Sequence, residues 1–87
     1  MSAEELATKY IITMEKTLNS MQQTKGPITV SDECINEVVS YVKAYLKDAK
    51  YFKEQKKFET CLTSIAYCEG LLDALKLINA VKTASTF

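Results

Sequence analysis

The sequence contains no histidine, no tryptophan and no arginine, so all eleven of its cationic side chains are lysines. Without histidine, the chain lacks the one side chain whose unperturbed pKa lies near neutrality, and the commonest acid–base group of enzymes is missing. Without arginine, it lacks the planar fork that binds phosphate or carboxylate in a bidentate manner. We therefore expect a protein that is not an enzyme, with no catalytic, cofactor-binding or metal-ligating residue.

Long hydrophobic runs and chain breakers are also scarce. No stretch approaches the roughly 20 apolar residues of a membrane-spanning helix, so we expect no membrane association. The cysteines number three, and no signal peptide precedes them, which favours a reducing compartment and a cytoplasmic protein. The only proline, Pro27, follows one of the two glycines, Gly26, so residues 23–30 form the predicted linker.

Size and charge set further bounds. The 87 residues allow one domain, spanning residues 1–87, and a chain this short buries only about 60–65% of its unfolded surface. Association with further chains is a natural supplement to such a modest core. Eleven acidic residues balance the eleven lysines, so the charge of the whole chain indicates no polyanionic partner.

Two amphipathic helices are predicted on either side of the linker. Ser2 and Glu5 have the spacing of a capping box at the start of a helix over 3–22. Ser31 is a good N-cap for a helix over 32–54. Apolar residues recur three and four apart in both, at Ala7, Ile11, Met14, Leu18 and Met21 and then at Ile35, Val38, Val42, Tyr45, Ala49 and Phe52.

The stretch 58–81 is the predicted centre of the fold, because it carries two apolar stripes. The first stripe contains Phe58, Cys61, Ile65, Cys68, Leu72 and Leu75, and the second stripe contains Tyr67, Leu71, Ala74, Ile78 and Val81. At about 100° per residue, the two stripes lie on different flanks of one helix, so each needs its own neighbour. We expect residues 32–54 to cover the first stripe and residues 3–22 the second. Cys61 and Cys68 are then buried, reduced thiols.

Together these elements predict an all-α fold, a three-helix bundle. The helices over 32–54 and 58–81 form a long antiparallel hairpin, because only residues 55–57 connect them. The N-terminal helix completes the bundle. The tail, residues 82–87, has no periodicity and is expected to fray.

One compact pattern lies between residues 40 and 78. It reads Asp48-Ala49-x-Tyr51-Phe52, followed by Tyr67-x-x-Gly70-x-Leu72-Asp73-Ala74. The pattern resembles an archaeal family of short proteins, the domain of unknown function 357, although Cys68 stands where the family pattern suggests a small alanine and residues 3–22 carry no matching motif. The resemblance implies an all-helical fold and an archaeal source, and it brings no assigned activity. In packing geometry alone, the hairpin also resembles a single tetratricopeptide-type unit, in which Lys56 replaces the glycine that usually occupies the turn.

The second stripe and Gly70 form the predicted interaction surface: Tyr67, Gly70, Leu71, Ala74, Ile78 and Val81. Glycine within a helix costs about 1 kcal/mol relative to alanine, so we expect the close approach of another helix to compensate at Gly70. Three slender helices leave apolar flanks exposed, which favours a homodimer. The linker permits the N-terminal helix to pack on its own chain or to be exchanged with a partner, and the sequence leaves both possibilities open.

Two charged groups offer alternative sites. Lys43, Lys47, Lys50 and Lys57 are predicted to lie opposite the apolar stripe of their helix, as a surface that could contact a nucleic-acid backbone. Asp48, Glu69 and Asp73 could form a carboxylate cluster for Mg²⁺ or Ca²⁺ across the hairpin, or simply surface charge. The resulting hypothesis is a non-catalytic interaction or assembly module, and the alternative is a nucleic-acid-binding accessory protein.

Overall fold

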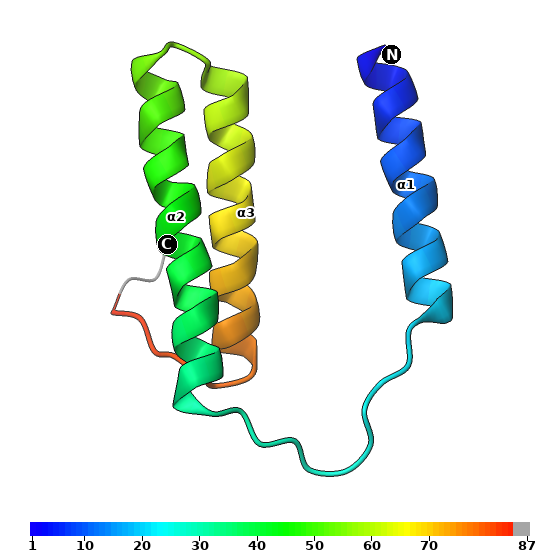
Figure 1. The fold of residues 1–87 in the computed structure, drawn as a ribbon, viewed down its shortest axis with the longest axis vertical. Coiled ribbons are helices and arrows are strands. Elements are labelled where there is room, and N and C mark those ends of the chain that lie inside the picture. Colours follow the sequence, from blue (N-terminus) through cyan, green and yellow to red (C-terminus); the bar gives the residue numbers. More distant parts are fainter. Residues whose placement is uncertain (85–87) are drawn as a thin grey trace.

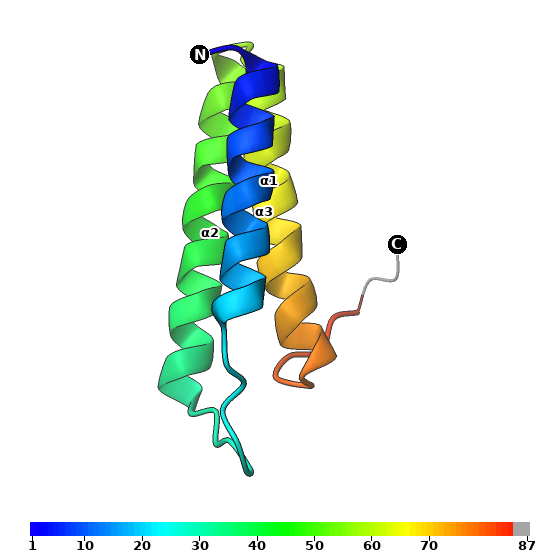
Figure 2. The same cartoon turned by 90° about the vertical axis from the view of Figure 1, so that its right-hand side faces the viewer.

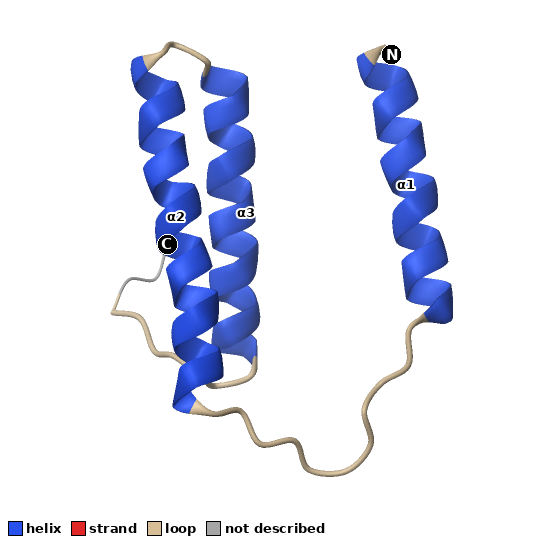
Figure 3. Ribbon diagram, viewed as in Figure 1, coloured by secondary structure: helices blue, strands red, loops and turns tan. Residues whose placement is uncertain are grey.

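The computed structural model describes residues 1–84, which form three helices and no strand (Figure 3). They are α1 (Ala3–Ser20), α2 (Asp32–Glu54) and α3 (Phe58–Leu77). Helices α2 and α3 lie side by side as an antiparallel hairpin, while α1 stands apart at the far end of a long loop (Figure 1). The all-α fold and its hairpin are therefore confirmed.

Helix α1 begins at the predicted capping box. The Ser2 hydroxyl accepts from the Glu5 backbone N–H at 3.1 Å, and the Glu5 carboxylate accepts from the Ser2 backbone N–H at 3.4 Å. These bonds satisfy two of the N–H groups that the first turn leaves without helical partners. The helix ends at Ser20, two residues before the predicted end, because Met21 turns to an extended conformation while its N–H still donates to the carbonyl of Thr17.

Helix α2 has the predicted bounds and ends in a Schellman motif. Lys56 adopts a left-handed conformation with φ of 59°. Its N–H donates to the Lys53 carbonyl at 3.0 Å, and the N–H of Lys57 donates to the Phe52 carbonyl at 2.9 Å. The turn thus satisfies carbonyls of the last helical turn without glycine. At its start, the Ser31 hydroxyl caps the helix by accepting from the N–H of Cys34.

Helix α3 ends earlier than the sequence pattern predicted. Asn79 has φ of 61°, and the N–H of Ala80 donates to the Leu75 carbonyl at 2.8 Å, which makes a second Schellman motif. The helix therefore stops at Leu77 and not at residue 81, and Ile78 and Val81 lie beyond it. Asparagine tolerates the left-handed conformation better than most residues, so Asn79 could have indicated the end of the helix from the sequence.

The first stripe of α3 packs against α2 as predicted, apart from its first residue. Ala49 of α2 and Cys68 and Leu75 of α3 are buried, and the Cys68 thiol donates to the Val42 carbonyl across the interface, with an Sγ–O distance of 3.4 Å. The flanking positions of both stripes are half-buried: Ile35, Val38, Val42, Tyr45, Phe52, Cys61, Ile65 and Leu72. Phe58, the first residue of α3 after the turn, is exposed. The core is thus a narrow seam between two helices.

Helix α1 does not cover the second stripe of α3 within the chain. No Cα atom of α1 lies within 8 Å of a Cα atom of α2 or α3, and α1 contains no buried residue. Figure 1 shows α1 separated from the hairpin, and both views show it running along the same direction as the hairpin helices (Figures 1 and 2). The connection, residues 21–31, has no helix or strand and carries the chain away through Gly26, whose φ is 83°. The bundle that the sequence predicted is therefore left open here.

The tail was expected to fray. Residues 82–84 contain no helix or strand. The rest of that prediction falls on residues 85–87, which lie outside the described part of the chain.

Candidate interaction surface

One exposed apolar surface of the hairpin lies on α3 and the segment that follows it. We call it the hairpin face, and it contains Tyr67, Gly70, Leu71, Ala74, Ile78 and Val81. Tyr67 and Ile78 are 53% and 59% exposed, Gly70 and Ala74 are also exposed, and Leu71 and Val81 are half-buried. The second stripe that the sequence predicted as an interaction surface is therefore open to solvent in the single chain.

An aromatic pair holds one edge of the hairpin face. The rings of Tyr45 in α2 and Tyr67 in α3 lie with their centroids 4.5 Å apart at 44°. Such tilted pairs add a modest stabilisation beyond their buried area. The pair fixes the position of Tyr67 and joins α2 to the surface, so Tyr41, one helical turn before Tyr45 and 51% exposed, extends it. Sequence reasoning assigned Tyr45 to the core and missed this cross-helix pair.

Gly70 does not have the neighbour that the sequence argument required. A Cβ atom built at this position would meet nothing within 4 Å other than its own helix, so no other helix of the chain approaches the Gly70 backbone. The prediction of a close helix contact is wrong for the single chain, because the only helix that could supply the contact, α1, is separated from the hairpin.

A second apolar surface lies on α1. Ile11, Met14, Leu18 and Met21 follow one stripe, and their exposed fractions range from 55% to 64%. Leu6 and Tyr10 widen the stripe, so that it is as wide as the apolar face of a helix that packs against a neighbour. The described residues thus hold two exposed apolar surfaces, one on α1 and one on the hairpin, that do not meet.

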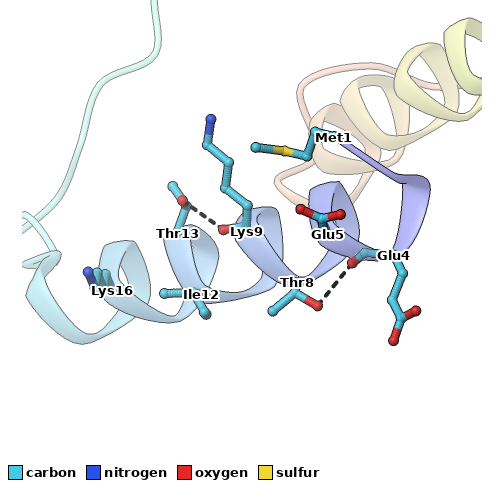
Figure 4. Close-up of a pocket in the computed structure, with 8 residues that line it drawn as sticks. All are labelled: Met1, Glu4, Glu5, Thr8, Lys9, Ile12, Thr13 and Lys16. Atoms are coloured by element: carbon cyan, nitrogen blue, oxygen red, sulfur yellow. Dashed lines mark hydrogen bonds between the residues drawn. The ribbon is translucent and has the colours of Figure 1, made fainter.

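The opposite side of α1 carries a shallow hollow of about 600 Å³. Its lining comes from Met1 and from one helix, through Glu4, Glu5, Thr8, Lys9, Ile12, Thr13 and Lys16 (Figure 4). Thr8 and Thr13 use their hydroxyls to donate to the carbonyls of Glu4 and Lys9, each at 3.0 Å. Because no second element closes this hollow, it has the character of a helix surface and not of a binding cavity.

The predicted lysine surface is only partly continuous. Lys43, Lys47 and Lys50 are exposed and share one face of α2 at spacings of four and three. Lys57 lies beyond the end of α2, as the N-cap residue of α3, so it does not continue the row as predicted. The lysines therefore form a short basic row of three residues with a fourth past the turn.

The predicted carboxylate cluster is not formed. Asp48, Glu69 and Asp73 are each exposed, and no group of three or more potential ligands within residues 1–84 lies close enough together to hold a metal ion. Asp48 belongs to α2 while Glu69 and Asp73 belong to α3, and the seam between these helices is filled by apolar residues. These carboxylates are therefore surface charges.

The cysteines divide by position. Cys68 is buried, as predicted, whereas Cys61 is half-buried and Cys34 is exposed, and all three are free thiols.

Leu62 and Leu77 lie on neither of the two predicted stripes of α3, and their side chains are 67% and 83% exposed. Within residues 1–84, no helix combines the length and the apolar character needed to cross a membrane.

The residues of the family-like pattern serve two purposes in the fold. Ala49, Phe52 and Leu72 lie in or beside the seam of the hairpin. The remaining positions are exposed, and of these only Tyr67 makes a ring contact across the hairpin: Asp48, Tyr51, Tyr67, Gly70, Asp73 and Ala74. Packing of the hairpin therefore explains only part of the pattern.

Comparison with known proteins identifies one family. Its description is protein of unknown function (DUF357), and its model matches residues 9–81, so the chain belongs to this family. The match includes most of α1, which carried no motif at the level of sequence reasoning, together with the whole hairpin. No curated protein and no solved structure matches the chain.

Proposed function

We propose that this member of the DUF357 family is a non-catalytic assembly module that forms a homodimer through the hairpin face and the apolar stripe of α1. The observation that carries the proposal is the amount of surface left exposed. The chain has 7979 Å² of accessible surface. A compact monomer of 9.8 kDa has about 5,200 Å², so roughly 2,800 Å² more is exposed than a closed fold of this size would leave.

The dimensions of the molecule support the same proposal. The radius of gyration over Cα atoms is 16.0 Å, whereas a compact domain of this length has about 12 Å. Obligate dimers bury about 2,000–5,000 Å² in total, so the excess surface of two chains is enough for such an interface. Much of that surface is apolar, which is the character of obligate interfaces.

The non-catalytic character rests on chemistry. Histidine and arginine are missing, and the apolar surfaces are the most developed unpartnered features of residues 1–84. The proposal places the protein in the cytoplasm, where its three free thiols, one of them exposed, would remain reduced.

Light scattering coupled to gel filtration tests the proposal directly. At micromolar concentration we expect a mass of about 20 kDa, twice that of one chain. A mass near that of a single chain would contradict self-association. The measurement should be repeated over a tenfold range of concentration, because an interface of this size is expected to persist on dilution.

A matched pair of substitutions locates the interface. Ile78→Asp places a charge on the hairpin face, and we expect it to shift the mass toward the monomer. Leu77→Asp is the control, because Leu77 is the adjacent residue, is 83% exposed and does not belong to the hairpin face. Both substitutions place an anion at the C-terminal end of α3, so any destabilisation of the helix by its dipole is the same in the two variants. Equal loss of the dimer in both variants would show that the hairpin face is not the interface.

The short basic row favours nucleic-acid binding as a second candidate. Lys43, Lys47 and Lys50 are exposed on the side of α2 away from the seam, where a phosphate backbone would have access. Fluorescence anisotropy with a labelled RNA should then show binding that weakens steeply with salt and is lost when the three lysines are changed to glutamate. No binding at low salt would exclude this candidate.

A further inference from the structure

Helix α1 is completely formed although neither α2 nor α3 covers it. It contains 18 residues, and isolated helices of about this length are only marginally stable in water. Its apolar stripe is exposed along the whole length, through Ile11, Met14 and Leu18. Tertiary packing is the usual source of stability for such a helix, so α1 needs a cover that α2 and α3 of its own chain do not supply in this arrangement.

We propose that α1 of each chain packs on the hairpin face of a second copy, so that the two chains exchange their N-terminal helices. The inference rests on the proposed homodimer and identifies what each copy contributes to it. Each hairpin face is then incomplete without the partner's α1. The alternative occupant is α1 of the same chain, folded back to close a three-helix bundle.

The linker supports exchange over closure within the chain. Residues 21–31 separate α1 from α2 and span up to about 36 Å when extended, which is long enough to reach a neighbouring molecule. The linker runs away from the hairpin and holds α1 separate from it (Figure 1). This open arrangement, with a complete element held away from its own chain, is that of a protomer in an exchanged dimer.

The two surfaces also match in length and direction. Helix α1 is about 27 Å long and α3 about 30 Å, so the stripe of one can lie along most of the other. In both views α1 runs in the same direction as α3 and opposite to α2. An exchanged dimer keeps the contacts of a closed bundle, so we expect α1 to lie parallel to the α3 helix that it covers. With their lengths aligned, the middle of α1, near Ile11 and Met14, faces the middle of α3, near Tyr67 and Leu71.

Gly70 and Ala74 provide the second observation in favour of the partner's α1. Both lie on the hairpin face, and an added Cβ at Gly70 meets only open space within the chain. Small side chains let another helix approach the backbone closely. The family match begins at residue 9 and extends to residue 81, so the family pattern includes most of α1 as well as the hairpin that α1 does not touch here.

Disulfide trapping distinguishes the two occupants. The variant carries Met14→Cys and Leu71→Cys in a Cys34→Ser background, which removes the exposed native thiol. After mild oxidation, a non-reducing denaturing gel should show a covalent dimer that disappears on reduction. The chains with only Met14→Cys or only Leu71→Cys are the matched controls, because they report any bond made through Cys61, through Cys68 or between two identical positions. Ile11→Cys with Tyr67→Cys is a second pair, one helical turn earlier on both helices.

Each outcome has one meaning. A covalent dimer in a double variant, and not in the two controls that carry only one of its introduced cysteines, supports exchange. A disulfide within a monomer, in a protein whose native mass is that of a dimer, overturns exchange and leaves self-association standing. A native mass of one chain removes the proposed dimer itself, and exchange with it. If neither pair forms a bond while the protein is a dimer, α1 does not lie on the hairpin face and the inference is wrong.

Discussion

The helices of the hairpin and α1 have equally clear sequence signals, yet only the hairpin helices bury their apolar stripes against each other. Both α1 and α2 begin with a serine cap, and both have an apolar stripe at helical spacing. In the hairpin, the stripes meet and bury Ala49, Cys68 and Leu75. In α1, the equivalent stripe meets neither α2 nor α3. The comparison teaches that a helix can be specified locally while its partner is not.

The largest expected effect comes from breaking the seam of the hairpin. Leu75→Ala removes a side chain that is 4% exposed, and we expect it to lower the free energy of unfolding by about 2–5 kcal/mol, the usual range for a buried leucine. Urea denaturation followed by circular dichroism measures the change. Leu77→Ala is the control, because its side chain is 83% exposed and should change stability by less than about 0.5 kcal/mol. Similar losses in both variants would mean that the seam is not the core.

The serine caps test whether α1 and the hairpin unfold together. Replacing an N-cap serine by alanine costs about 1 kcal/mol, so Ser31→Ala should lower the stability of the hairpin by that amount. Ser2→Ala removes the equivalent cap from α1, where the Ser2 hydroxyl accepts from Glu5. If α1 is covered by a partner, Ser2→Ala lowers the global unfolding free energy by a similar amount. If α1 is an isolated helix, the loss appears only as reduced helicity, with the midpoint of the main transition unchanged.

The smallest expected effect concerns Gly70. In a single chain, Gly70→Ala meets no steric conflict and should stabilise α3 by about 0.5–1 kcal/mol, because alanine is the better helix former. If another helix lies close to Gly70 in the dimer, the same substitution weakens association. Thermal unfolding and light scattering on one sample separate these two results. A gain in stability with unchanged dimerisation would show that no helix approaches Gly70.

Much of the hairpin could be predicted from the sequence because its signals are local. The bounds of α2 follow from Ser31 and from the end of its stripe, and the first stripe of α3 identifies the buried residues Cys68 and Leu75. The end of α3 was missed because apolar periodicity continues through Ile78 and Val81. Asn79 takes the left-handed conformation, which ends the helix before the pattern ends.

The sequence predicted which residues form the candidate surface, but it did not predict what those residues contact. Tyr67, Leu71 and Ile78 were placed on the second stripe from spacing alone. The ring contact between Tyr45 and Tyr67, and the empty space at Gly70, depend on how two helices are rotated about their axes. That rotation is set by many weak contacts at once, so no short stretch of sequence encodes it.

The sequence by itself determined where the helices begin, which faces are apolar and which chemistry is missing, because caps, periodicity and residue types act within a few positions of the chain. Only the tertiary structure decided that α2 and α3 share a seam while α1 lies apart with its stripe exposed. The physical reason is that an apolar stripe specifies a need for burial and not a partner. Hydrophobic burial is non-directional, so any surface of suitable shape can satisfy it, whether on the same chain or on another.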